Sequence, residues 1–299
     1  MDKEQLAIAR LQEASRMSLQ VYKQPLVVTT SGGKDSSVCV ALAERAGIPF
    51  EVMHSNTTAD APETVYFVRE EFKRLEAAGI KCTINHPIFK GQRTSMWQLI
   101  PQKLMPPTRT VRYCCAILKE RGGAGRFIVT GVRWEESSRR KNSRGIYETY
   151  ASDIAKRVIL NNDNDDRRRL FESCRLQAKR VCNPIIDWTD ADVWDYIKSE
   201  HLPLNPLYQC NFSRVGCIGC PMAGTKGRQR EFARYPIFQK NYIRAFERML
   251  KERAKRGMIT EKWESGKDVF HWWMDDGILP GQIELDGLLE GDDEDEAYL

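Results

Sequence analysis

The chain has 299 residues, of which 41% are hydrophobic and 29% charged, and its formal net charge is +5. This composition excludes a disordered chain and a small disulfide scaffold, and no apolar stretch approaches the roughly 20 residues that a membrane span needs. The N-terminal residues lack the basic and then apolar order of a secretory signal. We therefore expect a cytoplasmic protein with one sizeable core and no membrane partner.

Charge is distributed unevenly along the chain. Residues 284–299 include eight acidic residues and no Lys or Arg, so the rest of the chain carries all 46 basic residues and 33 of the 41 acidic ones. A basic body suits a nucleotide or a polyanionic partner. We predict a nucleotide-binding domain over 1–225, a helical region over 226–283 and an acidic tail over 284–299.

Strand-like and helix-like segments alternate through the first part of the chain. Apolar spacing predicts a first helix, and short β-branched runs predict buried strands separated by further helices. This alternation predicts an α/β protein with a doubly wound, mainly parallel sheet and a helical C-terminal extension. The expected strands are 26–30, 50–54, 81–85 and 126–133, with helices at 3–22, after 36 and from 62.

The second half of the chain is less regular. Residues 135–183 are the least regular part, and their run NNDNDDRRR over 161–169 reads as an insertion or exposed loop. The later segment TDADVWDYIKSE predicts a helix capped by Thr189 or Asp190. Residues 228–255 predict a long amphipathic helix or a helix pair. The run VFHWWM over 269–274 predicts a core-packing element.

A glycine-rich turn joins the first expected strand to the next helix. It reads Ser31-Gly32-Gly33-Lys34-Asp35-Ser36, and glycines let backbone N–H groups approach an anion. The helix start adds partial positive charge, and Lys34 with the hydroxyls of Ser31 and Ser36 would complete a phosphate cradle. Asp35 would orient the loop, hold Mg²⁺ or cap the helix. The alternative is a glycine turn without a ligand.

These six residues resemble the PP-loop motif SGGxDS of the ATP pyrophosphatase superfamily. The resemblance implies an adenine nucleotide alpha hydrolase-like fold. It also implies that the loop grips the β,γ-pyrophosphate of ATP in the presence of Mg²⁺ and leaves the α-phosphate open to attack. Lys34 and Asp35 would then be the catalytic residues of the loop.

Cysteines provide a second signal. Cys114 and Cys115 are adjacent, and Cys217 and Cys220 form a CxxC motif that can place two thiolates on one metal centre. Adjacent cysteines suit a tetrahedral zinc poorly. The order CC…CxxC after a PP-loop resembles the sulfonucleotide (APS/PAPS) reductase family, in which it holds a [4Fe–4S] cluster. A Zn²⁺ site and a metal-free pair are the alternatives.

Other segments, within about 24–225, are similar to the same family. Thr130-Gly131-Val132-Arg133, followed by Glu136 and Arg139, looks like a family segment that faces the nucleotide phosphates. The resemblance implies that Gly131, Arg133 and Arg139 bind phosphates and that Asn56 and Thr57 lie near the adenosine. Residues 189–208 look like the family stretch that leads into the second cysteine pair.

The chain also departs from the reductase pattern. Reductases of this kind use a C-terminal catalytic cysteine, whereas no cysteine follows Cys220 in these residues. The segment between the cysteine pairs is enlarged and basic. The chain therefore looks more like the DndC/SspD-type proteins of DNA phosphorothioation. That resemblance implies ATP-dependent adenylation of a backbone phosphate and sulfur from a cysteine desulfurase, together with other phosphorothioation subunits.

Three other functions fit the same residues. The first is a sulfonucleotide reductase that produces sulfite, and the second is a tRNA-thiolating PP-loop enzyme. The third is a catalytically silent binding subunit, which the intact loop disfavours. Three basic runs could contact DNA or tRNA, although solvated charged faces would look the same. They are residues 139–144, residues 167–180 and the set Lys226, Arg228, Arg230 and Arg234.

Overall fold

The computed structural model describes residues 2–120, 122–123, 125–150, 158–160, 179–258 and 263–275, without the side chains of residues 139, 150 and 158–160. The chain forms two compact units. Unit 1 comprises residues 1–55, 62–85 and 122–215, and unit 2 comprises residues 56–61, 86–121 and 216–299. The chain therefore passes between the units several times, whereas the organisation expected from the sequence was linear. The acidic tail over 284–299 lies outside the described residues.

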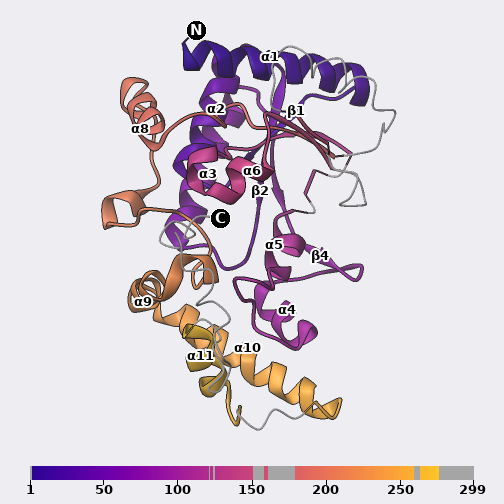
Figure 1. The fold of residues 1–299 in the computed structure, drawn as a ribbon, viewed down its shortest axis with the longest axis vertical. Coiled ribbons are helices and arrows are strands. Elements are labelled where there is room, and N and C mark those ends of the chain that lie inside the picture. Colours follow the sequence, from indigo (N-terminus) through magenta and orange to yellow (C-terminus); the bar gives the residue numbers. More distant parts are fainter. Residues whose placement is uncertain are drawn as a thin grey trace. The chain divides into compact units, whose positions relative to one another are not determined.

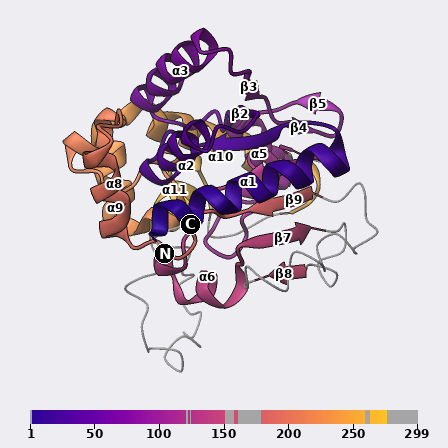
Figure 2. The same ribbon diagram turned by 90° about the horizontal axis from the view of Figure 1, so that it is seen from above.

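Unit 1 is built on a seven-stranded sheet of order β3-β2-β1-β6-β9-β7-β8 (Figure 2). The first five strands in this order run parallel, and β7 pairs antiparallel with both β9 and β8. This arrangement confirms the expected mainly parallel α/β fold. The strands are β1 (Leu26–Thr30), β2 (Phe50–Ser55), β3 (Cys82–Asn85), β6 (Phe127–Val129), β7 (Tyr147–Tyr150), β8 (Val158–Leu160) and β9 (Lys179–Cys182).

Alternating residues of the central strands bury both faces of this sheet. Leu26 and Val28 of β1 belong to the main core, in which α1 (Lys3–Tyr22) and α2 (Lys34–Arg45) also bury their apolar residues. Val27 packs on the opposite face with Ile128 and Val181. Parallel strands covered on both faces are apolar throughout, and this is why the sequence of β1 reads as a continuous run.

The parallel register brings several loops to one edge of the sheet. Thr30 lies opposite His54, and the N–H of Thr130 bonds the carbonyl of Cys182 at 3.0 Å. The segments after β1, β6 and β9 therefore leave the sheet at its carboxyl edge, where parallel α/β proteins place their ligands. The remaining helical elements of unit 1 are α3 (Pro62–Ala77), η1 (Trp134–Glu136), α6 (Ser138–Ser143), α8 (Asp190–Ser199) and η3 (Pro206–Cys210).

Two expectations about local structure need correction. The strand expected over 126–133 is regular only over Phe127–Val129, because the chain leaves the sheet at Thr130 and enters a 3₁₀ turn at Trp134. The region 135–183, expected to be the least regular, has α6 and three strands in its described parts, and the loop expected over 161–169 lies outside the described residues. About 30 residues separate β7 from β9 in the chain, so the sequence has no short turn that would identify them as an antiparallel hairpin.

Unit 2 is mostly helical (Figure 1). Its aromatic side chains, among them Trp97, Phe232, Tyr242 and Trp273, contact one another with ring centroids 4.6–6.2 Å apart. The region expected as a long helix or pair is a pair, broken at Tyr235 before Pro236. The elements are β4 (Ile88–Phe89), β5 (Gln92–Arg93), α4 (Met96–Lys103), α5 (Tyr113–Leu118), η4 (Pro221–Ala223), α9 (Gly224–Arg234), α10 (Pro236–Lys255) and α11 (Gly266–Met274).

None of the helices in the described part of the chain has the length and apolar character to cross a bilayer.

Candidate functional site

The glycine turn forms the expected strand–loop–helix junction in unit 1. Gly32 has φ +74°, a left-handed conformation that side chains disfavour, and a Cβ there would lie 3.0 Å from the Cγ2 of Thr64. Gly33 is the N-cap of α2. Asp35 is therefore the second residue of the helix, and the alternative that it caps the helix is wrong. Helix α2 therefore begins at the carboxyl edge of the sheet, directly after the loop.

Hydroxyl groups of Ser36 and Thr30 stabilise the loop by hydrogen bonds to its backbone. The buried Ser36 hydroxyl donates to the carbonyl of Gly33 at 2.8 Å and accepts from the N–H of Ser31 at 3.2 Å. The hydroxyl of Thr30 accepts from the N–H of Gly32 at 3.2 Å. In this structure Ser36 thus supports the loop shape, whereas Ser31 is exposed and available to a ligand.

Two residues of the 189–208 stretch also hold the loop, and the sequence did not assign them a role. Asn205 is 1% exposed, and its amide donates to the carbonyl of Gly32 at 3.2 Å and to the hydroxyl of Thr64 at 3.0 Å. The Tyr208 hydroxyl accepts from the N–H of Lys34 at 2.9 Å. The N–H of Lys34 belongs to the first turn of α2, where backbone N–H groups can donate hydrogen bonds to an anion. The signal in the sequence was the run Asn-Pro-Leu-Tyr, which shows no spatial target by itself.

A charge cluster surrounds the start of α2. Arg133 is 3% exposed, and its guanidinium donates to Asp35 at 2.7 Å, to Asp190 at 2.9 Å and to Glu135 at 3.0 Å. The Nζ of Lys34 lies 3.2 Å from Asp35 and 2.9 Å from Asp190. Both carboxylate oxygens of Asp35 are therefore engaged by cations. This arrangement favours the loop-orienting role of Asp35 over the role of a Mg²⁺ ligand.

The cluster shifts the pKa values of its members. Burial by itself would lower the pKa of Lys34, but the carboxylates of Asp35 and Asp190 outweigh it and raise that pKa. Burial would likewise raise the pKa of Asp190, whereas the hydrogen bond from Lys34 and the charge of Arg133 lower it. Lys34 therefore stays cationic at neutral pH, as a group that neutralises a phosphate must.

The other residues expected at the nucleotide site make the following contacts. Gly131 is a close-packing position, because a Cβ there would lie 2.8 Å from the backbone carbon of Asp35. The side chain of Arg139 lies outside the described part of the chain. Asn56 and Thr57 belong to unit 2, where the hydroxyl of Thr57 contacts the Sγ of Cys217 at 3.3 Å. Asn56 accepts from the N–H of Thr58 at 2.8 Å.

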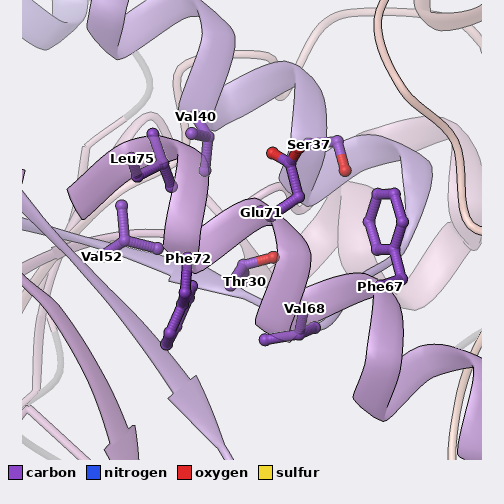
Figure 3. A pocket seen from close by; sticks show the side chains of 9 residues that line it. All are labelled: Thr30, Ser37, Val40, Val52, Phe67, Val68, Glu71, Phe72 and Leu75. Carbon is purple, nitrogen blue, oxygen red and sulfur yellow. The ribbon is translucent and has the colours of Figure 1, made fainter. Parts of the chain in front are cut away.

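A small pocket of unit 1 lies beside the glycine turn over residues 31–36, here called the phosphate loop (Figure 3). The pocket itself is chemically unsuited to phosphate. Its walls come from β1, β2, α2 and α3, and most of its nine lining side chains are apolar. None of the nine is cationic, and Glu71 is acidic. An anion would therefore be repelled there, and the loop itself remains the candidate phosphate site.

Helix α8 positions Asp190 through its N-terminal cap. Thr189 is the N-cap, as expected, and Asp192 accepts from its N–H at 2.6 Å and from its hydroxyl at 2.7 Å. Burial would raise the pKa of Asp192, but hydrogen bonds from Lys3 and Thr189 outweigh it and lower the value to about 2.

Replacing Asp192 with asparagine is expected to reduce the pH dependence of the free energy of unfolding below about pH 4. The folded-state pKa lies below the ordinary value of 3.8, so the carboxylate stabilises the fold fully above about pH 4 and loses that effect as the pH falls towards 2. Urea unfolding at a series of pH values measures the difference between Asp192→Asn and the unmodified chain. Parallel curves between pH 4 and 2 would contradict the assignment.

The CxxC motif forms a tight turn in unit 2. The N–H of Gly219 donates to the carboxylate of Glu231 at 2.6 Å, and the Tyr242 hydroxyl donates to the carbonyl of Ile218 at 2.9 Å. Gly219 has φ +73°, and a Cβ there would lie 2.6 Å from the ring of Phe232. Only glycine fits, so the aromatic core of unit 2 fixes the turn that carries Cys217 and Cys220.

The adjacent cysteines lie at the start of α5. The guanidinium of Arg112 donates to the Sγ of Cys115 at 3.4 Å. A hydrogen bond from Cys114, with the charges of Lys119 and Arg112, lowers the pKa of Cys115 against the effect of burial. The same hydrogen bond, together with burial, raises the pKa of Cys114. Burial also raises the pKa of Cys217.

These four thiols fit a [4Fe–4S] cluster by their chemistry. They belong to one unit, they interact electrostatically, and the cations Arg112 and Lys119 lie beside them. Among the described residues, no group of three or more His, Cys, Asp or Glu side chains is arranged to hold a metal ion. A single zinc needs four donors around one point, whereas each iron of a four-iron cluster takes its own thiolate. Four thiolates are a donor set that either a [4Fe–4S] cluster or a zinc ion can take.

Several arginines of the expected nucleic-acid surface are used inside the fold. Arg228 is fully buried and donates to the carbonyl of Trp273 at 2.7 Å, so the expectation that it contacts DNA is wrong. Arg140 pairs with Glu136, and Arg144 pairs with Glu148 at 2.8 Å. Arg167, Arg168, Arg169 and Arg175 of the second basic run lie outside the described residues.

Comparisons with known proteins identify the family of this chain. A model of the "Phosphoadenosine phosphosulfate reductase domain" matches residues 25–223. An uncharacterized protein of Methanocaldococcus jannaschii is 25% identical over 258 residues, which are 84% of this chain and 46% of that protein. The adenosine 5'-phosphosulfate reductase of Bacillus mycoides is 24% identical over 221 residues, which are 70% of this chain and 79% of that enzyme.

Among solved structures, the PAPS reductase of Candida auris in a phosphate complex aligns with a TM-score of 0.44 and 19% identity, over 69% of this chain and 87% of that one. The chain spans about half the length of the first curated relatives it matches. The family model covers both the phosphate loop and all four cysteines of the quartet. The chain therefore belongs to the phosphoadenosine phosphosulfate reductase domain family.

Proposed function

We propose that this chain is an ATP pyrophosphatase and sulfurtransferase that adenylates an acceptor phosphate, in the phosphorothioate modification of DNA. The observation that carries the proposal is the loop of unit 1, in which a left-handed glycine, the first turn of α2 and a buried, cationic Lys34 meet at the sheet edge. Such a loop binds phosphates through backbone N–H groups and one fixed cation.

The proposed reaction has three steps. An oxygen of the acceptor phosphate attacks the α-phosphorus of ATP, the bond between the α-phosphorus and the bridging oxygen breaks, and pyrophosphate leaves. Lys34 stabilises the charge that grows on the pyrophosphate. The outer sulfur of a persulfide, formed by a cysteine desulfurase, then attacks the activated acceptor phosphorus, and AMP departs with the oxygen that is replaced. A dithiol reductant then supplies two electrons and cleaves the S–S bond, which leaves the phosphorothioate and releases the carrier thiol.

Residues around the loop would orient these groups. Asp35, held by Lys34 and Arg133, fixes the first turn of α2, and Asn205 fixes the carbonyl of Gly32. Mg²⁺ would accompany ATP, as nucleotide triphosphates require charge compensation. The side chains of Cys114, Cys115, Cys217 and Cys220 would hold a [4Fe–4S] cluster, which when bound supplies redox chemistry.

A second candidate is sulfonucleotide reduction to sulfite. The relatives named adenosine 5'-phosphosulfate reductase favour it, and the same phosphate loop would accept the phosphate of a sulfonucleotide. The two candidates differ in their products. Transfer onto tRNA would use the same adenylation step and differs from the proposal only in the acceptor.

Product analysis of the full chain tests the proposal. Pyrophosphate release from ATP and Mg²⁺, stimulated by DNA, is the expected result. Sulfite release from APS or PAPS with thioredoxin, and no pyrophosphate from ATP, would replace the proposal by the second candidate. Stimulation by tRNA and not by DNA would overturn the assignment of the acceptor.

Replacing Cys217 with serine is expected to prevent cluster assembly. The substitution removes one of four thiolates while the turn remains fixed by Gly219 and Tyr242. The measurement is the iron and acid-labile sulfide bound per chain after anaerobic reconstitution. Cys210→Ser is the matched control, because this cysteine is exposed and outside the quartet. Equal iron in both variants, or uptake of zinc without iron by the unmodified chain, would contradict the prediction.

A further inference from the structure

Helix α10 of unit 2 carries a row of cations that the phosphate loop and the cysteines do not use. The row is spaced by four, four, three and four residues, which is the spacing of one face of an α-helix. All five side chains belong to exposed residues, and α10 extends over 20 residues. The row consists of Lys240, Arg244, Arg248, Lys251 and Lys255.

Beside this row runs a groove between α10 and α4, which lie side by side in unit 2 (Figure 1). The groove has a volume of about 400 Å³. Its α4 wall presents the exposed amides of Gln98 and Gln102 above Pro101. Its α10 side presents four cations and one carboxylate: Arg248, Lys251, Lys255, Arg256 and Glu252.

Negative charge in the groove is already neutralised. Glu252 pairs with Lys255 at 2.7 Å, and the other acidic residue of α10, Glu247, accepts from the N–H of Gly266 in α11 at 2.6 Å. In the described part of the chain, no ion pair is seen for Lys251 of the groove, nor for Lys240 and Arg244, which continue the row beyond the groove. Four cations line the groove and only one carboxylate does. The groove therefore has an excess of cations that no neighbouring carboxylate balances.

We propose that this groove, bounded by α4 and α10, binds the phosphate backbone of duplex DNA. At 1.5 Å per residue, the row from Lys240 to Lys255 is about 22 Å long, which matches about six phosphates of one strand at 3.4 Å each. Glutamine amides opposite the cations are typical donors to phosphate and sugar oxygens. The inference rests on the proposed function, because it supplies the surface that holds the acceptor.

Duplex DNA is favoured over a single strand by the residues that are absent from the groove. Proteins that bind single strands stack the bases on aromatic side chains. None of the eight residues that line the groove is aromatic. Cations and amides without a stacking platform suit a backbone whose bases remain paired, and they read no sequence.

The test replaces two exposed lysines of the groove with residues of similar helix propensity. Fluorescence anisotropy measures binding of the full chain to a labelled duplex of about 20 base pairs, roughly two helical turns. The double variant Lys251→Gln/Lys255→Gln is expected to weaken binding roughly 10- to 100-fold near 0.1 M salt, and to flatten the slope of log K against log salt by about 2, as loss of two phosphate contacts requires.

The matched control is Lys73→Gln/Lys81→Gln in unit 1. Lys73 is 71% exposed and pairs with a glutamate three residues earlier, as Lys255 does at 69% exposed. The control removes the same charge from the chain but leaves every residue that lines the groove in place, so it is expected to retain its affinity within about twofold.

Each contrary result is informative. Equal loss in both variants, no loss in the groove variant, tighter binding of the single strand or of an RNA duplex, or no binding of the duplex at all would overturn the inference. Pyrophosphate release from ATP without DNA is measured on the same variants. If pyrophosphate release persists without duplex binding, only the inference about the groove is overturned. If the duplex binds but no pyrophosphate is released, only the proposed function is overturned.

Discussion

Replacing Lys34 with methionine is expected to lower the turnover of pyrophosphate release by about 10²–10³-fold, the usual cost of removing one preorganised charge or donor from a reaction that develops negative charge. The Nζ of Lys34 is held 2.9 Å from Asp190 and 3.2 Å from Asp35 before any ligand binds. Because the ammonium is fixed in advance, it needs no reorganisation when the pyrophosphate leaves. The readout is pyrophosphate formed per minute at saturating ATP.

The same substitution is expected to leave the fold intact. Arg133 still neutralises Asp35 and Asp190 in the variant, and methionine retains much of the apolar stem. Lys73→Met serves as the control, since that lysine is exposed on α3. A loss of turnover below tenfold in a folded Lys34→Met protein would show that this ammonium does not face the leaving group.

Replacing Arg133 with methionine is expected to lower the free energy of unfolding by about 3 kcal/mol. Removing one partner from a buried ion pair typically costs about 3–5 kcal/mol, because the remaining charge stays desolvated. Here Glu135 and Asp190 are each about half exposed and regain water, so the lower end applies. Asp35, at 25% exposed, retains Lys34 as its partner.

Urea unfolding measures this effect as a lower midpoint at an unchanged slope. The matched control is Arg74→Met. Arg74 also makes a two-pronged pair, with Glu44 at 2.9 Å, but its side chain is 47% exposed, so a loss below about 1 kcal/mol is expected. Equal losses in the two variants would show that burial does not determine the contribution of Arg133.

Local patterns predicted much of the fold correctly. The β-branched run of β1, the glycine turn after it and the capped start of α8 each depend on residues near one another in the chain. Strands β7 and β9 were missed because their pairing joins Tyr147 to Cys182 across a long separation. Only a sheet already formed by β1 and β6 provides the edge on which β9 pairs.

Residues of the candidate site divide in the same way. The phosphate loop could be found from six consecutive letters, and Arg133 from its place after a strand. Tyr208 and Asp190 could not, because neither residue has a chemical signal until the fold brings it within 2.9 Å of a Lys34 atom. The burial of Arg228 was equally invisible, since a basic run looks the same whether or not one member packs under Trp273.

The amino-acid sequence by itself determined the α/β class, the strand–loop–helix junction at 26–45 and the membership suggested by the loop and the cysteine quartet. Each of these rests on short-range periodicity or on fixed spacing, which chain geometry converts directly into structure. Only the tertiary structure decided which charges are partnered, which glycines are packing positions and which basic face remains open. Those properties depend on distances between residues far apart in the chain, and burial and Coulomb energies follow distance in space rather than along the sequence.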